Sequence, residues 1–360
     1  MLTRRALIAL VTGLAVVVAA STASAKTPKD FFGVVEGAPV QVDDAGRMVN
    51  TGVSSYRFAL NWSQVQPHRG PFDWSHSDDI VGKLAAQGIG TLPFMYGTPS
   101  WLASSPNSPP RSGRKRTGWK RFLKAAVERY GPGGSYWSGS KIGYSIFNMQ
   151  CSCTAKPQPI RAWQIWNEPN YGNYWRGKPS AKGYARLVKT SHDAITGVDG
   201  HARIVLAGLK PSKHNTAWDF LDRMYNVRGI KRDFDATALH PYADSIAQLR
   251  TSIKRFRGAQ ERNHDGRTPL WMTELGWGSG KRSQSHLNRG LKGQKRMLNS
   301  SFRLIVHNRK RWNIGRLFWF SWRDGGTYAT GSCDFCASAG LLDADAHRKP
   351  AFYAYRRFAK

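Results

Sequence analysis

A glutamate at residue 168 stands in the most informative stretch of this 360-residue sequence. Residues 163–170 read WQIWNEPN, and the apolar, β-branched and aromatic residues among them indicate a buried strand. Pro169 cannot continue a central strand, and it favours an extended conformation for Glu168 before it. A carboxyl group at a strand end among indole rings is in surroundings that raise its pKa, which suits proton donation. The alternative is a solvated glutamate in a strand-to-helix turn.

A second glutamate, Glu274, repeats this pattern. Residues 270–277 read LWMTELGW, an apolar strand that ends in a carboxylate with glycine and tryptophan just beyond. The strand ends of one barrel meet at one face, so Glu168 and Glu274 can converge there. Two carboxyl groups about 5–5.5 Å apart cleave a glycosidic bond with retention, and a separation of roughly 6.5–9.5 Å gives inversion. We expect Glu168 to be the protonated member of the pair. The alternative for Glu274 is an ion pair at a barrel rim.

The two segments resemble the catalytic motifs of the clan of retaining glycoside hydrolases that fold as (β/α)8 barrels. In that clan the acid/base glutamate ends strand four and the nucleophilic glutamate ends strand seven. The sequence WQIWNEPN is similar to the corresponding motif of the β-xylosidase- and iduronidase-like branch of the clan, and the motif of the cellulase-like branch is also similar. The resemblance extends over essentially the whole chain after residue 25. It implies that Glu168 is the acid/base and Glu274 the nucleophile.

The resemblance also implies roles for four other polar residues. Arg57, in the expected second strand, matches the arginine that keeps the nucleophile ionised, although a plain salt bridge at the barrel mouth would also explain it. Asn167 matches the residue that bonds the 2-hydroxyl group of the sugar. His240 and Tyr242 follow the expected sixth strand, where relatives orient the nucleophile or contact substrate. The sequence leaves open which of these two takes that part.

Aromatic residues near the expected strand ends are candidates for sugar platforms, because the C–H faces of sugar rings pack well on indole. Trp322 resembles the indole under the subsite that holds the cleaved sugar. Trp101, Tyr171, Trp175 and Trp277 are further candidates. The chain has 14 tryptophans, so several of them must be core residues instead.

The elements that must position these residues alternate regularly, which predicts a single α/β domain with a (β/α)8 TIM barrel. No Gly/Ser-rich linker and no short repeat interrupts them. Strands are expected at 31–35, 54–60, 89–96, before Glu168, and at 203–208, 234–240, 269–273 and 315–320. Helices are expected at 77–87, 119–130, 182–196, 217–226, 245–257, 287–308 and 349–358, and residues 131–159 are expected to form a long loop.

The first 25 residues have the features of a secretory signal peptide. Two arginines precede an apolar run at residues 6–20, and Ala23-Ser24-Ala25 follows, so we expect cleavage after Ala25 and a barrel domain at 26–360. An uncleaved anchor is the alternative, but the run is short for a membrane span. The protein is therefore expected to be secreted and not anchored in a membrane, with association to the cell wall as an additional possibility.

Export would permit disulfides among the four cysteines. We expect Cys333 and Cys336, a close pair in a loop, to be bridged. Cys151 and Cys153 are too close in sequence for an unstrained bridge, so their state is open. A zinc site built from all four cysteines is disfavoured because the barrel would place the two pairs at opposite ends.

The formal net charge is +31, with 54 Lys and Arg against 23 Asp and Glu. The basic residues concentrate at 111–129, 254–267 and 281–311. Such an excess attracts polyanions, and together with export it favours an anionic cell-wall or extracellular polymer. No motif for specific nucleic-acid recognition accompanies it, and two of the three stretches are amphipathic helices for which a solvated basic face is ordinary.

The sequence therefore predicts a secreted, monomeric, retaining glycoside hydrolase that acts on a poly- or oligosaccharide with no metal and no organic cofactor. Two alternatives are kept. The first is a non-catalytic, lectin-like or wall-binding protein on the same scaffold, because a fold alone does not fix a function. The second is a transglycosylase, because transglycosylation and hydrolysis share their first chemical step.

Overall fold

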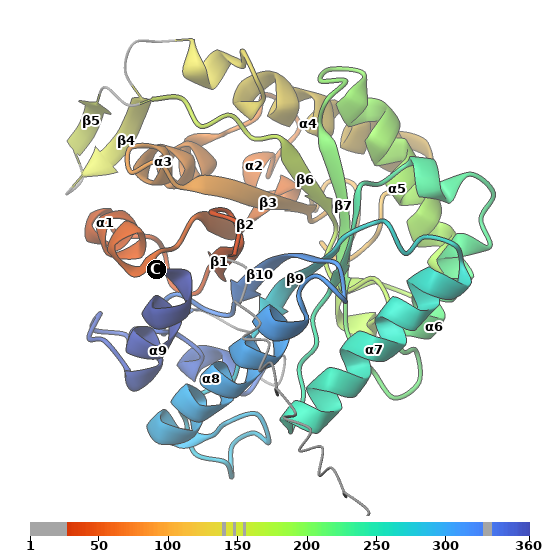
Figure 1. The fold of residues 1–360 in the computed structure, drawn as a ribbon. Coiled ribbons are helices and arrows are strands. Elements are labelled where there is room, and N and C mark those ends of the chain that lie inside the picture. The colour runs from red at the N-terminus through yellow and green to blue at the C-terminus, as the bar shows by residue number, and fades with distance from the viewer. Residues whose placement is uncertain (1–26, 139–141, 147–148, 154–155, 327–332) are drawn as a thin grey trace, which may run out of the picture.

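The computed structural model of the chain describes residues 27–138, 142–146, 149–153, 156–326 and 333–360. Within them, eight parallel strands close into a barrel in the order β1-β10-β9-β8-β7-β6-β3-β2 (Figure 1). The expected (β/α)8 barrel is confirmed. The barrel strands are β1 (Phe32–Val35), β2 (Ser55–Asn61), β3 (Gly90–Tyr96), β6 (Ala162–Ile165), β7 (Arg203–Leu209), β8 (Ala236–Leu239), β9 (Leu270–Leu275) and β10 (Ile314–Trp319).

Helices surround the barrel and carry the amphipathic patterns seen in the sequence. In α4, for example, Trp119, Phe122 and Leu123 are buried at helical spacing while the lysines and arginines between them point outward. The helices are α1 (Val42–Thr51), α2 (Trp62–Val65), α3 (Ser75–Ala85), α4 (Gly113–Tyr130), α5 (Ala181–Thr196), α6 (Ala217–Tyr225), α7 (Ile246–Arg262), α8 (Gly290–Asn308) and α9 (Pro350–Ala359).

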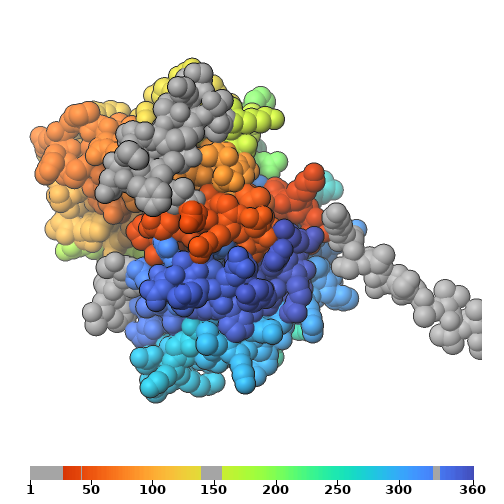
Figure 2. All heavy atoms as spheres, turned by 90° about the vertical axis from the view of Figure 1, so that its left-hand side faces the viewer, coloured from red at the N-terminus to blue at the C-terminus, as the bar shows by residue number. Residues whose placement is uncertain are grey.

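The first and last parts of the chain lie side by side and close the barrel. Strand β1 pairs with β2 on one side and with β10 on the other. In Figure 2 the red and orange N-terminal segments pack directly against the blue C-terminal ones. Every barrel strand therefore has two neighbours, so no edge is left unpaired.

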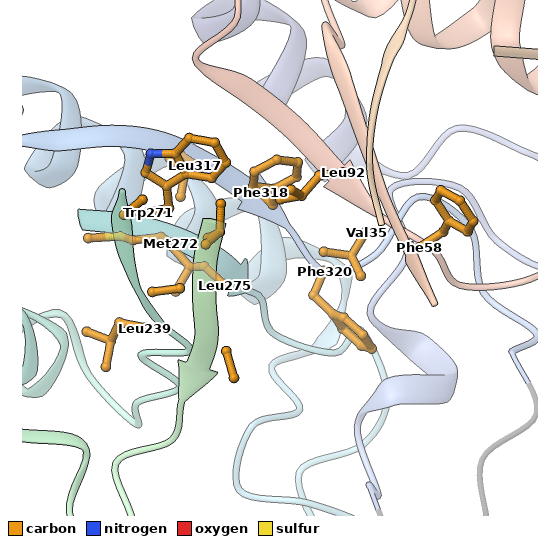
Figure 3. Packing of buried hydrophobic residues seen from close by; sticks show 14 of the residues in the cluster. Val35, Phe58, Leu92, Leu239, Trp271, Met272, Leu275, Leu317, Phe318 and Phe320 are labelled. Carbon is orange, nitrogen blue, oxygen red and sulfur yellow. The ribbon is translucent and has the colours of Figure 1, made fainter. Parts of the chain in front are cut away.

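The interior of the molecule is a continuous apolar core. Figure 3 shows side chains from β1, β2, β3, β8, β9 and β10 converging, among them Leu92, Met272 and Leu317. The parallel strands are buried on both faces, and the burial of all six residues of β9 is an example. This packing fixes the positions of the strand ends, where the candidate site lies.

Three features differ from the sequence-based expectation: helix α1, the short helix α2 and a hairpin in the region 131–159. Helix α1 was not expected, because Asp43, Asp44 and Gly46 have low helix propensity. In the structure the Asp44 carboxylate accepts a hydrogen bond from the Gln41 backbone N–H at 2.8 Å, which caps the N-terminus of the helix. The region 131–159 is not only loop: β4 (Ile142–Ile146) and β5 (Met149–Cys153) form an antiparallel hairpin outside the barrel. Pairing between two short strands supplies the order that the local pattern did not indicate.

The expected signal peptide, with its cleavage after Ala25, lies outside the described residues, so the expected domain start at residue 26 stays a prediction. Among the helices that the structure does describe, none combines the length and the apolar character that crossing a bilayer requires.

Candidate active site

Glu168 and Glu274 come together at the carboxyl ends of the barrel strands. Glu274 is the fifth residue of β9, the seventh barrel strand, and Glu168 follows β6, the fourth. One carboxylate oxygen of each lies within 4.8 Å of the other, and both side chains are largely buried, with 4% of Glu168 and 9% of Glu274 exposed. The fold thus places two carboxyl groups across a gap about the size of a glycosidic linkage.

Arg57 binds one side of this pair. It is fully buried in β2, and its Nη1 donates to Glu274 Oε1 at 2.7 Å while its Nη2 donates to Asn167 Oδ1 at 3.0 Å. Its Nε donates to Gln164 Oε1 at 2.6 Å, and the guanidinium lies 4.1 Å from the centre of the Phe94 ring. A guanidinium group held by this many contacts has a fixed position, so it stays in direct contact with Glu274.

Tyr242 and His240 contact the two carboxyl groups from β8 and the turn that follows it. The Tyr242 hydroxyl donates to Glu274 Oε2 at 2.6 Å. His240 Nδ1 lies 2.9 Å from Glu168 Oε1 and 3.4 Å from Glu274 Oε2, and its Nε2 lies 3.0 Å from Thr273 Oγ1. Both residues therefore reach the pair, and Tyr242 is the one that bonds the expected nucleophile most directly.

The His240 ring is held neutral in this position. Burial lowers the pKa of His240 to about 3, and although the Glu274 charge raises it, the charges of Arg57 and Lys210 add to the lowering. A Cβ atom at Gly208 would lie 1.9 Å from His240 Nε2, so the ring occupies space that only a glycine in β7 leaves open. A neutral imidazole can accept a hydrogen bond from the Glu168 carboxyl group through Nδ1 while its Nε2–H donates to Thr273 Oγ1.

The two carboxyl groups have different electrostatic surroundings. Burial raises the pKa of Glu168, and the more distant charges of Lys210 and Arg57 offset part of that effect. Glu274, by contrast, is in direct contact with the Arg57 guanidinium and the Tyr242 hydroxyl. The arrangement thus sets a carboxyl group whose pKa is raised by burial beside one that is held by direct hydrogen bonds, an asymmetry that acid–nucleophile chemistry requires.

The backbone around Glu168 is not extended, which corrects the expectation drawn from Pro169. Strand β6 ends at Ile165, and Trp166 and Glu168 have φ values of 72° and 38°. These values lie in the left-handed region that residues other than glycine rarely adopt, and such residues cluster at functional sites. The turn is held by the Trp166 N–H, which donates to the Met95 carbonyl at 2.9 Å, and by the Trp166 indole, which donates to the Tyr174 carbonyl at 2.6 Å.

Lys210 is a functional candidate that the sequence analysis missed. It directly follows β7, and Asn170 joins its backbone to the turn after Glu168 through two hydrogen bonds, at 2.7 and 3.1 Å. Its Nζ lies 4.4 Å from the centre of the Tyr171 ring, and among the described residues no ion pair with an acid is recorded for it. A lysine directly after an expected strand was a usable signal, because such positions face the site.

Two other polar residues near the site, Gln164 and Glu36, were also missed. Gln164 bonds Arg57, the Leu206 carbonyl and Thr273 Oγ1, so it ties β2, β6, β7 and β9 together. Glu36 follows β1, and burial raises its pKa to about 7. A glutamine inside the apolar run WQIW was a usable signal, because a polar residue in a buried strand needs a partner.

Two expected sugar platforms are wrong. Trp322 is only 1% exposed, donates its indole N–H to Asp44 Oδ1 at 2.9 Å and packs against Phe352 of α9. Trp277 is fully buried, and its indole N–H donates to the Ala243 carbonyl at 2.8 Å. The Trp322 indole thus lies against α1 and α9, and the Trp277 indole lies near Ala243 and Trp319 of β10, so neither is accessible to a sugar.

A different aromatic residue, Phe320, follows β10 on the side of the carboxylates, and its ring centre lies 6.3 Å from that of Tyr242. A third expected platform, Trp175, is also fully buried and is wrong for the same reason, whereas Trp101 and Tyr171 are partly exposed. The Trp101 indole donates to the Gln66 carbonyl at 3.0 Å, and Tyr171 lies under Lys210. Only these last two keep surface available for a ligand.

Glu168, His240 and Glu274 are also close enough to offer three metal ligands. The Arg57 guanidinium already lies 2.7 Å from Glu274, and a divalent cation in contact with the same carboxylate would be repelled by it. The donor set therefore suits a pair of reacting carboxyl groups better than a metal ion.

Cys333 and Cys336 lie close together, with Cα atoms 5.5 Å apart, a separation that suits a disulfide. Two sulfurs bonded to each other do not act as thiolate ligands, so a disulfide here would remove half of the ligands of the four-cysteine zinc alternative. The side chains of Cys151 and Cys153 lie outside the described part of the chain.

The closed barrel has two carboxyl groups at its carboxyl-end face, which is the arrangement that TIM-barrel glycosidases use. A family model described as glycosyl hydrolase catalytic core matches residues 135–349, and the chain belongs to that family. No curated protein sequence matches the chain.

Several solved structures share the fold. A family 39 glycoside hydrolase from Bacteroides cellulosilyticus has a TM-score of 0.66 and 18% identity, with 92% of this chain and 64% of that chain covered. A monomeric β-xylosidase from Caulobacter crescentus has a TM-score of 0.63 and 16% identity, with 91% and 67% covered. An intracellular xylanase from Thermoanaerobacterium saccharolyticum has a TM-score of 0.60 and 15% identity, with 90% and 94% covered. The chain thus spans less than two thirds of the first of these proteins.

Proposed function

We propose that this glycosidase acts by double displacement with retention of configuration, with Glu274 as nucleophile and Glu168 as acid/base. The proposal rests on one observation: the two carboxyl groups have oxygens within 4.8 Å of each other. A gap of this size leaves room for direct attack on the anomeric carbon, whereas inversion needs roughly 6.5–9.5 Å to accommodate a water molecule.

In the first step the Glu274 carboxylate attacks the anomeric carbon and forms a covalent glycosyl ester. Glu168 gives its proton to the glycosidic oxygen, so the leaving group departs as a neutral alcohol. The raised pKa of the buried Glu168 keeps it protonated for this task. The Tyr242 hydroxyl and the Arg57 guanidinium hold Glu274 with both oxygens hydrogen-bonded, which fixes its direction of attack.

In the second step Glu168, now a carboxylate, takes a proton from water while the water oxygen attacks the anomeric carbon from the opposite side. The ester bond breaks, Glu274 returns to its ionised state and Glu168 regains its proton. If a sugar hydroxyl takes the place of water, the same step gives transglycosylation. Asn167, held by Arg57 at 3.0 Å, is positioned beside Glu168 to bond the 2-hydroxyl group of the sugar.

The stereochemical outcome tests this proposal. Wild-type enzyme is incubated with aryl glycosides of both anomeric configurations, led by β-xylosides because two of the similar structures are a β-xylosidase and a xylanase. Proton NMR of the first product formed, recorded before mutarotation, is expected to show the anomer of the substrate. A first product of the opposite anomer would mean that a water molecule attacks directly, and the role given to Glu274 would be wrong.

The charge of Lys210 gives a pH prediction. This charge lowers the pKa of Glu168, so Lys210→Met should raise that pKa and keep the acid protonated to higher pH. The alkaline limb of the kcat/KM profile should therefore move to higher pH, as measured with a neutral aryl glycoside. Lys213→Met, which removes an exposed lysine on the same loop, is the control and should leave the limb in place. A shift of the Lys210→Met profile to lower pH would contradict the proposed electrostatics.

We also propose that the enzyme works outside the cell, as a monomer, with a Cys333–Cys336 disulfide. The signal-like residues 1–25 and the net charge of +31 support this location, because a strongly cationic protein is retained by anionic wall or extracellular polymers. N-terminal sequencing of protein recovered from culture medium, with and without a high-salt wash of the cells, tests cleavage after Ala25 and retention together.

A further inference from the structure

A cavity of about 410 Å³ opens at the N-terminal ends of the barrel strands. Its lining includes Ser55, Gly90, Ala162 and Arg203, which are the first residues of β2, β3, β6 and β7. Glu168 and Glu274 lie at the carboxyl ends of the strands, so the cavity is on the opposite face of the barrel from the candidate active site. Its volume is in the range of about 300–1,000 Å³ that small-molecule sites occupy.

The lining of this cavity is strongly basic. Arg161, Arg203, Arg316 and His201 all contribute to it, and no acidic residue does. Arg316 pairs with Asp30 at 2.6 Å, but among the described residues neither Arg161 nor Arg203 has a recorded ion pair with an acid. Three arginines that share one recess with a single acidic neighbour leave an excess of positive charge there.

The arginines are close enough to affect one another. Burial lowers the pKa of Arg316, the neighbouring Asp30 raises it, and the charge of Arg203 lowers it again. The Arg316 guanidinium also lies 4.7 Å from the centre of the Trp271 ring, which restricts its movement; Figure 3 shows Trp271 at the edge of the packed core. A bound anion would offset the repulsion between Arg203 and Arg316.

The cavity also holds a buried hydroxyl group with no partner in the described part of the chain. Ser55 lies two residues before Arg57 on β2, so its side chain points to the same inner face of the barrel. It is only 2% exposed, and its Oγ has no hydrogen-bond partner there, although buried hydroxyls are nearly always hydrogen-bonded. An unpaired O–H donor beside guanidinium groups has the chemistry that a tetrahedral oxyanion requires.

We propose that this cavity at the N-terminal mouth of the barrel binds a phosphate or sulfate group. The flat guanidinium forks of Arg161, Arg203 and Arg316 match its oxygens, and the Ser55 hydroxyl donates from the floor. A free ion, a phosphorylated or sulfated sugar, and a group on an anionic polymer share this chemistry. The site is independent of Glu168 and Glu274, so its occupation and the glycosidase reaction can be tested separately.

Titration calorimetry with inorganic phosphate tests the proposal, at constant ionic strength maintained with chloride. Wild type should bind one phosphate per chain, and Arg161→Gln/Arg203→Gln should weaken binding about tenfold or more, because charge-assisted hydrogen bonds are lost. Ser55→Ala, which removes one hydroxyl and no charge, should weaken it by a smaller factor. Glycosidase activity should be unchanged in these variants.

A matched control separates a built site from general attraction to a cationic protein. Arg250→Gln/Arg282→Gln removes two exposed charges outside the cavity lining and should bind phosphate like wild type. Equal weakening in both double variants, or no binding by wild type, would overturn the proposal. Repeating the titration with glucose 6-phosphate and with a poly(glycerol phosphate) identifies the source of the phosphate group. If the polymer binds to wild type and this binding is lost in Arg161→Gln/Arg203→Gln, the ligand is of the cell-wall type. If only the smaller probes bind, the ligand is a free metabolite.

Discussion

Replacing Glu274 with alanine is expected to lower kcat by about 10⁵-fold, because removal of a covalent nucleophile removes the only route through the first step. Added sodium azide should restore part of the turnover. Azide is small enough to enter the space left by the side chain, and it attacks the anomeric carbon from the face that Glu274 faced. The product should be a glycosyl azide of inverted configuration, identified by NMR.

A folding defect could imitate this result, since the same substitution leaves the buried Arg57 without its ion pair. Breaking a buried pair in this way costs about 3–5 kcal/mol of stability. Glu274→Gln is the companion variant, because its amide oxygen can still accept from Arg57 while it cannot act as a nucleophile. Glu128→Gln, an exposed glutamate on α4, is the matched control. If Glu274→Gln melts like wild type and keeps its activity, Glu274 is not the nucleophile.

Glu168→Gln is expected to have the second-largest effect, and its size should depend on the leaving group. With an alkyl glycoside, kcat/KM should fall by about 10²–10⁴-fold, because the departing alcohol needs a proton. With a 2,4-dinitrophenyl glycoside, kcat/KM should change little, since that phenolate leaves without help. The alkaline limb of the pH profile should vanish, because the buried carboxyl group whose raised pKa sets it has been removed.

Azide distinguishes the two carboxyl groups. In Glu168→Gln the glycosyl-enzyme still forms on Glu274, and azide attacks it from the side that Glu168 occupied. The glycosyl azide should therefore have retained configuration, opposite to the product from Glu274→Ala. Identical azide products from the two variants would be incompatible with the assignment of one nucleophile and one acid/base.

These outcomes are expected because Glu168 and Glu274 have the same carboxyl group but different neighbours in the tertiary structure. Arg57 and Tyr242 contact Glu274 directly, whereas Glu168 is buried beside a neutral His240. Gly208 leaves the space that the His240 ring occupies, because any side chain at residue 208 would collide with that ring. The different surroundings of the two carboxyl groups are thus set by residues from β2, from β7 and from the segment after β8, which are far apart along the chain.

Much of the fold could be predicted from the sequence because its signals are local. The eight strands are short apolar runs bounded by turns, and helices such as α4 and α8 have a clear apolar spacing. Helix α1 and the β4–β5 hairpin were missed, because the first depends on a cap and on packing and the second on pairing between two strands. Interactions of these kinds leave little trace in residue type.

The candidate site also has a part that could be predicted from local sequence and a part that could not. Asn167-Glu168-Pro169 and the Glu274 segment could be read directly, since each is an abrupt polar end to an apolar strand. The burial of Trp322 and Trp277 could not, because an indole at a strand end has the same sequence signature whether it faces the cleft or a helix. Lys210 was overlooked because its proximity to Glu168 arises from Asn170 hydrogen bonds across two strand ends.

The sequence by itself determined the barrel and the two carboxyl groups that its strand ends present, because hydrophobic periodicity and strand termination are properties of neighbouring residues. Only the tertiary structure decided which side chains surround each carboxyl group, which tryptophans are inaccessible, and that arginines gather at the opposite mouth of the barrel. Those properties depend on distances between residues from different strands, and such distances exist only once the barrel has closed.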